Sequence, residues 1–121
     1  MPSRQRILLV NDDDDALFLL RRSVSRALPE AEVALLDDPV EALAYFQKHH
    51  VDAIVTDNTM PQMDGLSFVR HVRSRDGRIP VLMVTNSMHL SDEAAAAGVT
   101  HYLPCARWNE VGALLASLLQ D

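Results

Sequence analysis

The chain has 121 residues, of which 48% are hydrophobic, and a formal net charge of −6. This length favours a single domain over residues 1–121, and the apolar content argues against wholesale disorder. The acidic balance argues against direct nucleic-acid binding, the longest apolar run of five residues cannot span a membrane, and one cysteine, Cys105, cannot form an intrachain disulfide. These features indicate a cytoplasmic globular domain.

Apolar stretches of two kinds alternate along the first half of the chain. Residues 7–10 form a continuous apolar run, which is typical of a strand buried on both faces. Apolar residues at steps of three and four then predict a helix that ends before Pro29. A second strand over residues 33–36 is followed by Asp38 and Pro39, which predict the cap and the first position of another helix.

The second half of the chain continues this alternation. Ser91 is expected to cap one of its helices, and Gly98 is expected to end that helix. Four arginines near the third helix are interpreted as solvent-exposed charge: Arg70, Arg73, Arg75 and Arg78. The predicted elements are a strand at 53–55, a helix around 66–72, a strand at 81–84, a helix at 91–97, a strand at 102–103 and a helix at 111–118.

Five strand–helix units in strict alternation predict an α/β fold, with a parallel sheet covered by helices on both faces. In such a sheet, ligands bind beyond the carboxyl ends of the strands, so the residues at those positions are candidates for function. They are Asn11 to Asp15 after the first strand, Asp57 to Thr59 after the third, Thr85 to Ser87 after the fourth, and Pro104 and Cys105 after the fifth.

Asp12 and Asp57 are the carboxylates on which we base a functional hypothesis. Two neighbouring carboxylates repel each other unless a cation neutralises them, and Mg²⁺ takes a few carboxylates together with water and a phosphate oxygen. A metal-supported aspartate can also attack a phosphoryl group and form an aspartyl phosphate, to which the Thr85 hydroxyl could donate. Capping of the following helix is the alternative for the acidic run. We assign the acids at 14 and 15 to capping and leave Asp13 open.

Other catalytic sites have little support in the sequence. The chain has only four glycines and no glycine-rich phosphate loop, and Cys105 and the five histidines lack zinc-site spacing. His49 and His50 fall at the end of a helix, where a charge interacts with the helix dipole. Cys105 has no histidine predictably beside it, which disfavours a nucleophilic role.

Residues 57–65 carry the most specific pattern of the chain. They resemble the phospho-acceptor segment of the receiver domain of two-component response regulators. The acidic turn after residues 7–10 resembles the metal-binding turn of that family. Residues 80–85 resemble its fourth strand with the switch threonine, and Gly98 followed by Tyr102 resembles its fifth strand with the switch aromatic. The resemblance covers nearly the whole chain.

This resemblance implies a flavodoxin-like fold whose five-stranded sheet has the order 2-1-3-4-5. It implies that Asp57 accepts a phosphoryl group from a sensor histidine kinase or a phosphotransfer protein. Mg²⁺ would be held by Asp12, Asp57 and the main-chain carbonyl of Thr59. Thr85 and Tyr102 would form a switch pair that changes how an output partner, or a second copy in a homodimer, binds one surface. That surface is made by helix 91–97, strand 102–103 and helix 111–118.

Two residues depart from the family pattern. Asn11 stands where the family usually has the first of two acids, so we expect it to contact Mg²⁺ through water and to weaken metal binding. Cys105 stands where the family usually has a lysine that pairs with the phosphoryl oxygens. Loss of such a charge-assisted hydrogen bond is worth roughly 1.5–3 kcal/mol. Lys48, the only lysine, is predicted at the end of the second helix, and Arg107 is the nearest other cation in sequence.

Three functional hypotheses follow. The first is a divergent receiver that is phosphorylated on Asp57 but has weakened activation, and whose only reactions are its own phosphorylation and dephosphorylation. The second is a module of the same fold that binds proteins without phosphorylation. The third is a small Mg²⁺-dependent phosphatase, which is disfavoured because the sequence shows neither a substrate pocket nor a second acid for a leaving group.

Overall fold

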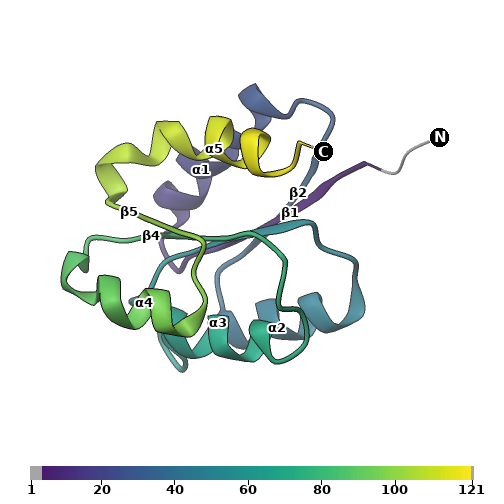
Figure 1. Ribbon diagram of the computed structural model, residues 1–121. Coiled ribbons are helices and arrows are strands. Elements are labelled where there is room, and N and C mark those ends of the chain that lie inside the picture. Colours follow the sequence, from purple (N-terminus) through teal and green to yellow (C-terminus); the bar gives the residue numbers. More distant parts are fainter. Residues whose placement is uncertain (1–3, 121) are drawn as a thin grey trace.

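A computed structural model of the protein describes residues 4–120 as a parallel sheet between two layers of helices (Figure 1). The strand order is β2-β1-β3-β4-β5, as predicted. The strands are β1 (Arg6–Val10), β2 (Glu32–Leu36), β3 (Ala53–Thr56), β4 (Val81–Val84) and β5 (His101–Leu103). The α-helices are α1 (Asp14–Ala27), α2 (Pro39–Lys48), α3 (Gly65–Arg73), α4 (Ser91–Ala97) and α5 (Val111–Leu118).

The sheet separates two apolar cores, because successive side chains of a strand point to opposite faces. Leu8, Val10 and Ile54 pack with residues of α2, α3 and α4, whereas Ile7 and Leu9 pack with residues of α1 and α5. Figure 1 shows the same division, with α1 and α5 above the sheet and the other three helices below it. Burial of each large apolar side chain stabilises the fold by about 1.5–3 kcal/mol.

An aspartate is the N-cap residue of each of the first three helices. The Asp13 carboxylate accepts hydrogen bonds from the backbone N–H groups of Asp15 and Ala16, so Asp13 is a capping residue. Asp38 caps α2 with Pro39 in its first turn, which confirms that prediction. These bonds satisfy N–H groups that have no partner within the helix.

The prediction that Ser91 caps a helix is wrong. A 3₁₀ turn, η1 (Met88–Leu90), runs directly into α4, and Ser91 has helical backbone angles at the junction. The predicted end of α4 is confirmed, because Gly98 has a left-handed φ of 104°. A second 3₁₀ segment, η2 (Cys105–Glu110), precedes α5 and was not predicted.

Arg73 is structural rather than solvent-exposed, which corrects the interpretation of the arginine group. Its Nε and Nη2 atoms donate to the carbonyl oxygen of Gly98 over 3.0 and 2.8 Å. Its Nη1 atom donates to the carbonyl of Asp76 over 3.2 Å. The half-buried guanidinium therefore joins the carboxyl ends of α3 and α4.

Helices α1 and α5 approach each other unusually closely at Gly112. A Cβ atom at this position would lie 2.6 Å from the carbonyl carbon of Ser23. The Ser23 hydroxyl accepts a hydrogen bond from the Gly112 N–H over 2.9 Å and donates to the Asn109 carbonyl over 3.2 Å. This contact fixes α5 against α1.

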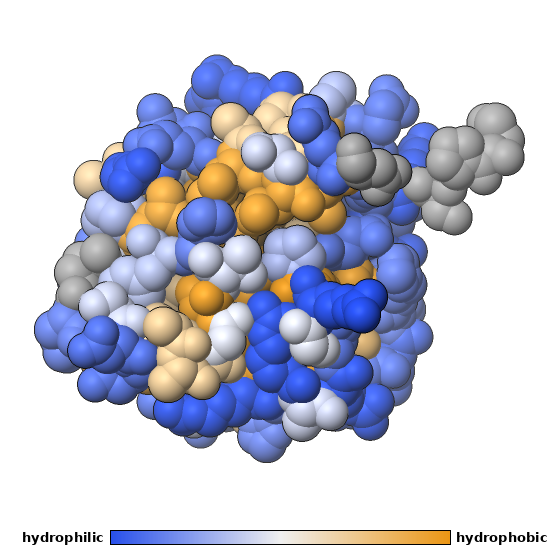
Figure 2. Space-filling model, in the orientation of Figure 1, coloured by the Kyte–Doolittle hydropathy of each residue, from blue (hydrophilic) through white to orange (hydrophobic). Residues whose placement is uncertain are grey.

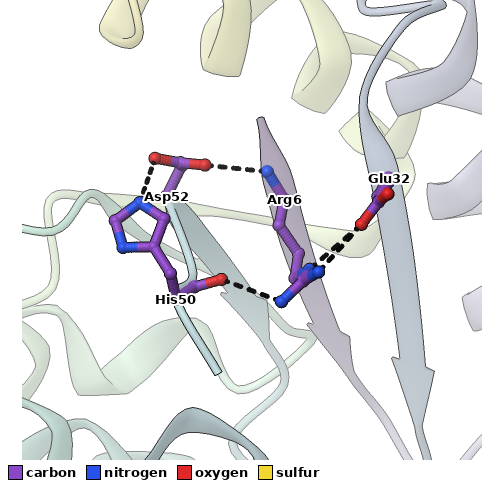
Figure 3. Close-up of polar contacts among 4 residues, drawn as sticks. All are labelled: Arg6, Glu32, His50 and Asp52. Atoms are coloured by element: carbon purple, nitrogen blue, oxygen red, sulfur yellow. Dashed lines mark hydrogen bonds and ion pairs between the residues drawn. The ribbon is translucent and has the colours of Figure 1, made fainter. Parts of the chain in front are cut away.

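A polar network ties the amino ends of β1 and β2 to the segment before β3 (Figure 3). Arg6 pairs with Glu32 over 3.0 Å, and the Arg6 N–H donates to Asp52 over 2.8 Å. His50 contacts the same carboxylate over 2.9 Å, so it pairs with Asp52 as well as following a helix end. Exposed ion pairs contribute little stability, but these contacts hold three strand ends in register. Within residues 4–120, no helix combines the length and the apolar character that crossing a membrane requires.

Candidate functional site

The carboxyl ends of three neighbouring strands bring the predicted site residues to one edge of the sheet. Val10 pairs with Thr56, and the Asp57 N–H donates to the Val10 carbonyl over 3.2 Å, so Asp57 lies beside the turn that holds Asp12. Thr85 follows β4 on the other side of β3, and its N–H donates to the Leu103 carbonyl of β5 over 2.9 Å.

Asp57 is held by its own loop. Its Oδ1 atom accepts a hydrogen bond from the Asn58 N–H over 2.6 Å, and the carboxyl is half-buried. Gly65 lies against the same backbone, because a Cβ atom there would lie 2.8 Å from the Asn58 Cα. The Gly65 N–H also donates to the Asn58 carbonyl over 2.8 Å. Glycine at 65 therefore allows α3 to start directly beside the candidate phospho-acceptor.

In the acidic turn, Asp12 lies apart from the residues that shape the turn. The Asn11 side chain is only 3% exposed, and its Oδ1 atom accepts a hydrogen bond from the Asp13 N–H over 2.9 Å. Asp13 caps α1, whereas Asp12 is exposed and its carboxylate makes no hydrogen bond among the described residues. Asn11 and Asp13 thus fix the turn and leave the Asp12 carboxylate at the rim of the site.

The donor atoms at this edge are oxygens of the types that Mg²⁺ takes. Residues 4–120 contain no group of three histidine, cysteine, aspartate or glutamate side chains placed to bind one metal ion. Mg²⁺ does not require such a group, because it is commonly held by one or two carboxylates with waters and carbonyl or phosphate oxygens. Asp12 and Asp57 would supply the carboxylates, and the exposed loop at Thr59 would supply a main-chain carbonyl.

Thr85 and Tyr102 both contact the segment that leads into α4. Thr85 is only 1% exposed, and its hydroxyl accepts a hydrogen bond from the Ser87 N–H over 3.1 Å. The half-buried Tyr102 hydroxyl donates to the Ser87 carbonyl and accepts from the Leu90 N–H over 3.3 Å. The sequence offers no signal for these tyrosine contacts, because they depend on the 3₁₀ turn η1.

Cys105 begins η2 and lies near the carboxylates of the site. Its side chain lines a small apolar cavity of about 80 Å³ together with Asn11 and Trp108. Burial, and then the negative charges of Asp57 and Asp13, raise the pKa of the thiol. Cys105 is therefore a neutral group in a negative environment at neutral pH.

Cys105 stands where the family usually has a lysine, and the two cations named above in that connection, Arg107 and Lys48, lie elsewhere in the structure. Arg107 forms a pair with Glu110 over 2.6 Å, and this contact lowers the pKa of the Glu110 carboxyl. Lys48 lies in the last turn of α2, as predicted. Trp108 lies within η2 and is half-buried.

Comparison with known protein families matches residues 7–105 to the response regulator receiver domain. The chain is 40% identical over 101 residues to the response regulator MprA of Mycobacterium sp. (strain KMS) and to that of Mycobacterium leprae (strain TN). These alignments cover 82% of this chain and 43% of each relative, so the chain spans less than half the length of the curated relatives it matches.

Solved structures show the same architecture. The chemotaxis response regulator CheY4 of Vibrio cholerae superposes with a TM-score of 0.80 at 28% identity, over 97% of this chain and 100% of that one. A putative response regulator from Chloroflexus aurantiacus J-10-fl gives a TM-score of 0.86 at 25% identity, over 97% and 98% of the two chains. With the family match, the sheet order and the sequence relatives in agreement, the chain belongs to the response regulator receiver domains of two-component signal transduction.

Proposed function

We propose that Asp57 is a phospho-acceptor that receives a phosphoryl group from the histidine of a sensor kinase or phosphotransfer protein. A carboxylate oxygen of Asp57 forms the new bond to phosphorus, while the bond from phosphorus to the histidine nitrogen breaks and the imidazole regains a proton. The observation that carries this proposal is the place of Asp57, a half-buried carboxylate beside the Asp12 turn and one strand away from the buried Thr85 hydroxyl.

The residues around Asp57 have separate tasks in this reaction. The Asn58 N–H orients the carboxyl by holding one oxygen, which leaves the other for phosphorus. Mg²⁺, bound by Asp12, Asp57 and the Thr59 carbonyl, would neutralise the negative charge that gathers as the phosphate approaches. The Thr85 hydroxyl accepts a hydrogen bond from the Ser87 N–H in this structure. It would give up this contact and donate a hydrogen bond to a phosphoryl oxygen.

This exchange would carry the signal to an output partner. Movement of Thr85 changes the segment that Tyr102 also holds, and this segment leads into α4. The surface formed by α4, β5 and α5 would then change its partner affinity. Figure 2 shows hydrophobic side chains gathered where Figure 1 places α5, and a hollow of about 420 Å³ there is lined by Leu103 and Leu114. Coupling of this kind is typically worth ~1–3 kcal/mol.

We infer that activation is weakened in this chain. A neutral thiol at Cys105 cannot form the charged contact that a lysine would make with phosphoryl oxygens. Asn11 removes a further charge from the metal turn. The chain would act as a regulatory domain whose chemistry is limited to its own phosphorylation and dephosphorylation.

A second candidate function is a receiver fold that binds partners without phosphorylation. Two observations favour it. The thiol of Cys105 is neutral where the family usually has a lysine, and Tyr102 already contacts the segment before α4. In this case the surface of α4, β5 and α5 would have the same partner affinity whether or not Asp57 is modified.

Titration of Mg²⁺ and then beryllofluoride, with Trp108 fluorescence as the readout, separates the two candidates. Trp108 lines the cavity beside Cys105 and is the only tryptophan of the chain. Phosphorylation predicts a Mg²⁺-dependent change that is lost in Asp57→Asn. If the wild-type protein binds neither the metal nor beryllofluoride at millimolar concentrations, phosphorylation of Asp57 is excluded and phosphorylation-independent binding is the remaining candidate.

A further inference from the structure

Phe18 is an aromatic side chain on the outer surface of α1, and 59% of it is exposed. It separates two hollows in the surface. One of about 400 Å³ lies between α1 and the edge strand β2 and includes Phe18, Leu35 and Asp37 in its lining. The other, of about 240 Å³, is lined by Phe18, Arg21, Arg22 and Ser25. Leu35 of β2 is itself 37% exposed, so the aromatic ring and the edge strand form one apolar patch.

Charged residues flank Phe18 in opposite directions along α1. Asp14 and Asp15 lie in the first turn, and Arg21 and Arg22 lie about one turn after Phe18. All four are exposed, and the ion pairs among residues 4–120 involve none of them. We call the surface formed by these four residues, Phe18 and Leu35 the Phe18 face.

The Phe18 face is complementary to itself. Phe18 is midway in sequence between Asp14 and Arg22, and also between Asp15 and Arg21. Two antiparallel α1 helices related by a two-fold axis at Phe18 therefore place the acidic turn of each copy at the height of the arginines of the other. Residues three, four and seven apart share one side of a helix, so both charged groups can reach across the same contact.

We propose that a second copy of this chain docks on the Phe18 face by antiparallel packing of α1 against α1. The same surface supplies the aromatic ring, the hollow beside Leu35 that receives it, two acids and two bases, as a two-fold interface requires. This self-complementarity favours a second copy over an unrelated helix, which would need a matching charge order of its own.

The location separates this contact from the proposed signalling surface. Strand β2 and strand β5 are the opposite edges of the sheet, so the Phe18 face lies toward the edge away from β5, although α5 itself packs against α1. Docking on the Phe18 face therefore does not require the proposed change in the surface of α4, β5 and α5. The patch is small and its ion pairs are exposed, so we expect a weak dimer that loosens as salt is added.

A charge-swap experiment tests the proposed register. Sedimentation of the 121-residue chain at low salt should show a monomer–dimer equilibrium. The double variant Asp14→Arg/Asp15→Arg and the double variant Arg21→Glu/Arg22→Glu should each be monomeric, because like charges then face each other. An equal mixture of the two variants should dimerise again, because opposite charges meet at both ends of the contact.

Two further variants complete the test. Phe18→Ala should weaken dimerisation by roughly tenfold or more while circular dichroism stays unchanged. Arg70→Glu/Arg75→Glu, which makes the same charge change on exposed positions of α3 and the turn after it, should leave the dimer intact. A wild-type chain that stays monomeric at millimolar concentration, or a mixture that fails to restore the dimer, would overturn the proposal. Beryllofluoride binding by the wild type and by Phe18→Ala, which leaves the charges near Asp12 unchanged, reports separately on Asp57.

Discussion

At Asp57, main-chain contacts rather than charged side chains fix the geometry. The Asn58 N–H holds one carboxylate oxygen, and Gly65 allows the next helix to start against the same backbone. Asp12 is the other carboxylate at this edge, and it is exposed. These contacts support the proposal that Asp57 takes part in binding a metal and a phosphoryl group. Cys105 contributes a neutral thiol, whereas a positive charge there would stabilise the proposed aspartyl phosphate.

A positive charge at position 105, where the family usually has a lysine, should increase the affinity for a phosphoryl mimic. We expect Cys105→Lys to tighten the apparent affinity for beryllofluoride with Mg²⁺ by roughly ten- to a hundredfold, since a charge-assisted hydrogen bond is worth about 1.5–3 kcal/mol. Trp108 fluorescence measures the affinity. Cys105→Ser, which adds no charge, is the control and should match the wild type. Equal affinities in all three proteins would show that the missing lysine does not limit activation.

We expect the ionisation of Cys105 to respond to burial first and then to the charge of Asp57. Because the folded thiol has a raised pKa, its stabilising contribution is present at low pH and is lost as the pH rises through the folded pKa. Labelling by iodoacetamide should therefore rise at a higher pH than for a free thiol. Asp57→Asn should move this profile to lower pH, whereas Asp92→Asn on the exposed side of α4 should not. Identical profiles in the wild type and Asp57→Asn would contradict the proposed proximity.

At the scale of elements, the contact between α1 and α5 depends on a missing side chain. Gly112→Ala should lower the free energy of unfolding by about 1–3 kcal/mol, because the added Cβ collides with the backbone of Ser23. Gly77→Ala is the matched control, since a Cβ there has open space around it. Urea denaturation measures both. Equal stability of the two variants would mean that α5 can move away from α1 without loss.

The sequence predicted the regular elements well for a physical reason. Continuous apolar runs identify strands buried on both faces, and apolar residues three and four apart identify the helices that cover the sheet. Every strand and α-helix was therefore found within a few residues. The caps at Asp38 and Gly98 were also predicted, because their chemistry is local. The wrong assignment of Ser91 arose because an unpredicted 3₁₀ turn continues directly into α4.

Long-range contacts were not predictable in the same way. Arg73 joins two helix ends that lie 25 positions apart, and no local pattern distinguishes it from the exposed arginines beside it. For the site, the strand-end rule identified Asp12, Asp57 and Thr85 as neighbours at one edge. It could not show that Asn11 is buried and engaged with the Asp13 N–H, because that depends on the shape of the turn.

At the scale of the whole molecule, the two ends of the parallel strands carry different groups of polar residues. The network at Arg6, Glu32 and Asp52 ties the amino ends of the strands, while the candidate site occupies their carboxyl ends. In the two proposals above, one protein-binding surface, the Phe18 face, would lie beside β2, and the other, the output surface, would lie beside β5.

Metal binding should stabilise the folded molecule as a whole. Mg²⁺ at ten times its dissociation constant adds about 1.4 kcal/mol to the free energy of unfolding, because it binds only the folded site. Thermal denaturation should therefore shift upward with Mg²⁺ in the wild type and much less in Asp12→Asn. Glu30→Gln, which removes an acid far from the site, should keep the shift. A shift of the same size in Asp12→Asn would place the bound metal elsewhere.

The most direct test of the account is phosphoryl transfer to the chain. Incubation with acetyl phosphate and Mg²⁺, followed by intact mass measurement, should show the addition of one phosphoryl group to the wild type. The addition should be absent in Asp57→Asn, should disappear on treatment with hydroxylamine as an acyl phosphate does, and should reach a higher fraction in Cys105→Lys. A wild-type and a Cys105→Lys protein that both stay unmodified, or an addition that persists in Asp57→Asn, would contradict the assignment of Asp57 as the phospho-acceptor.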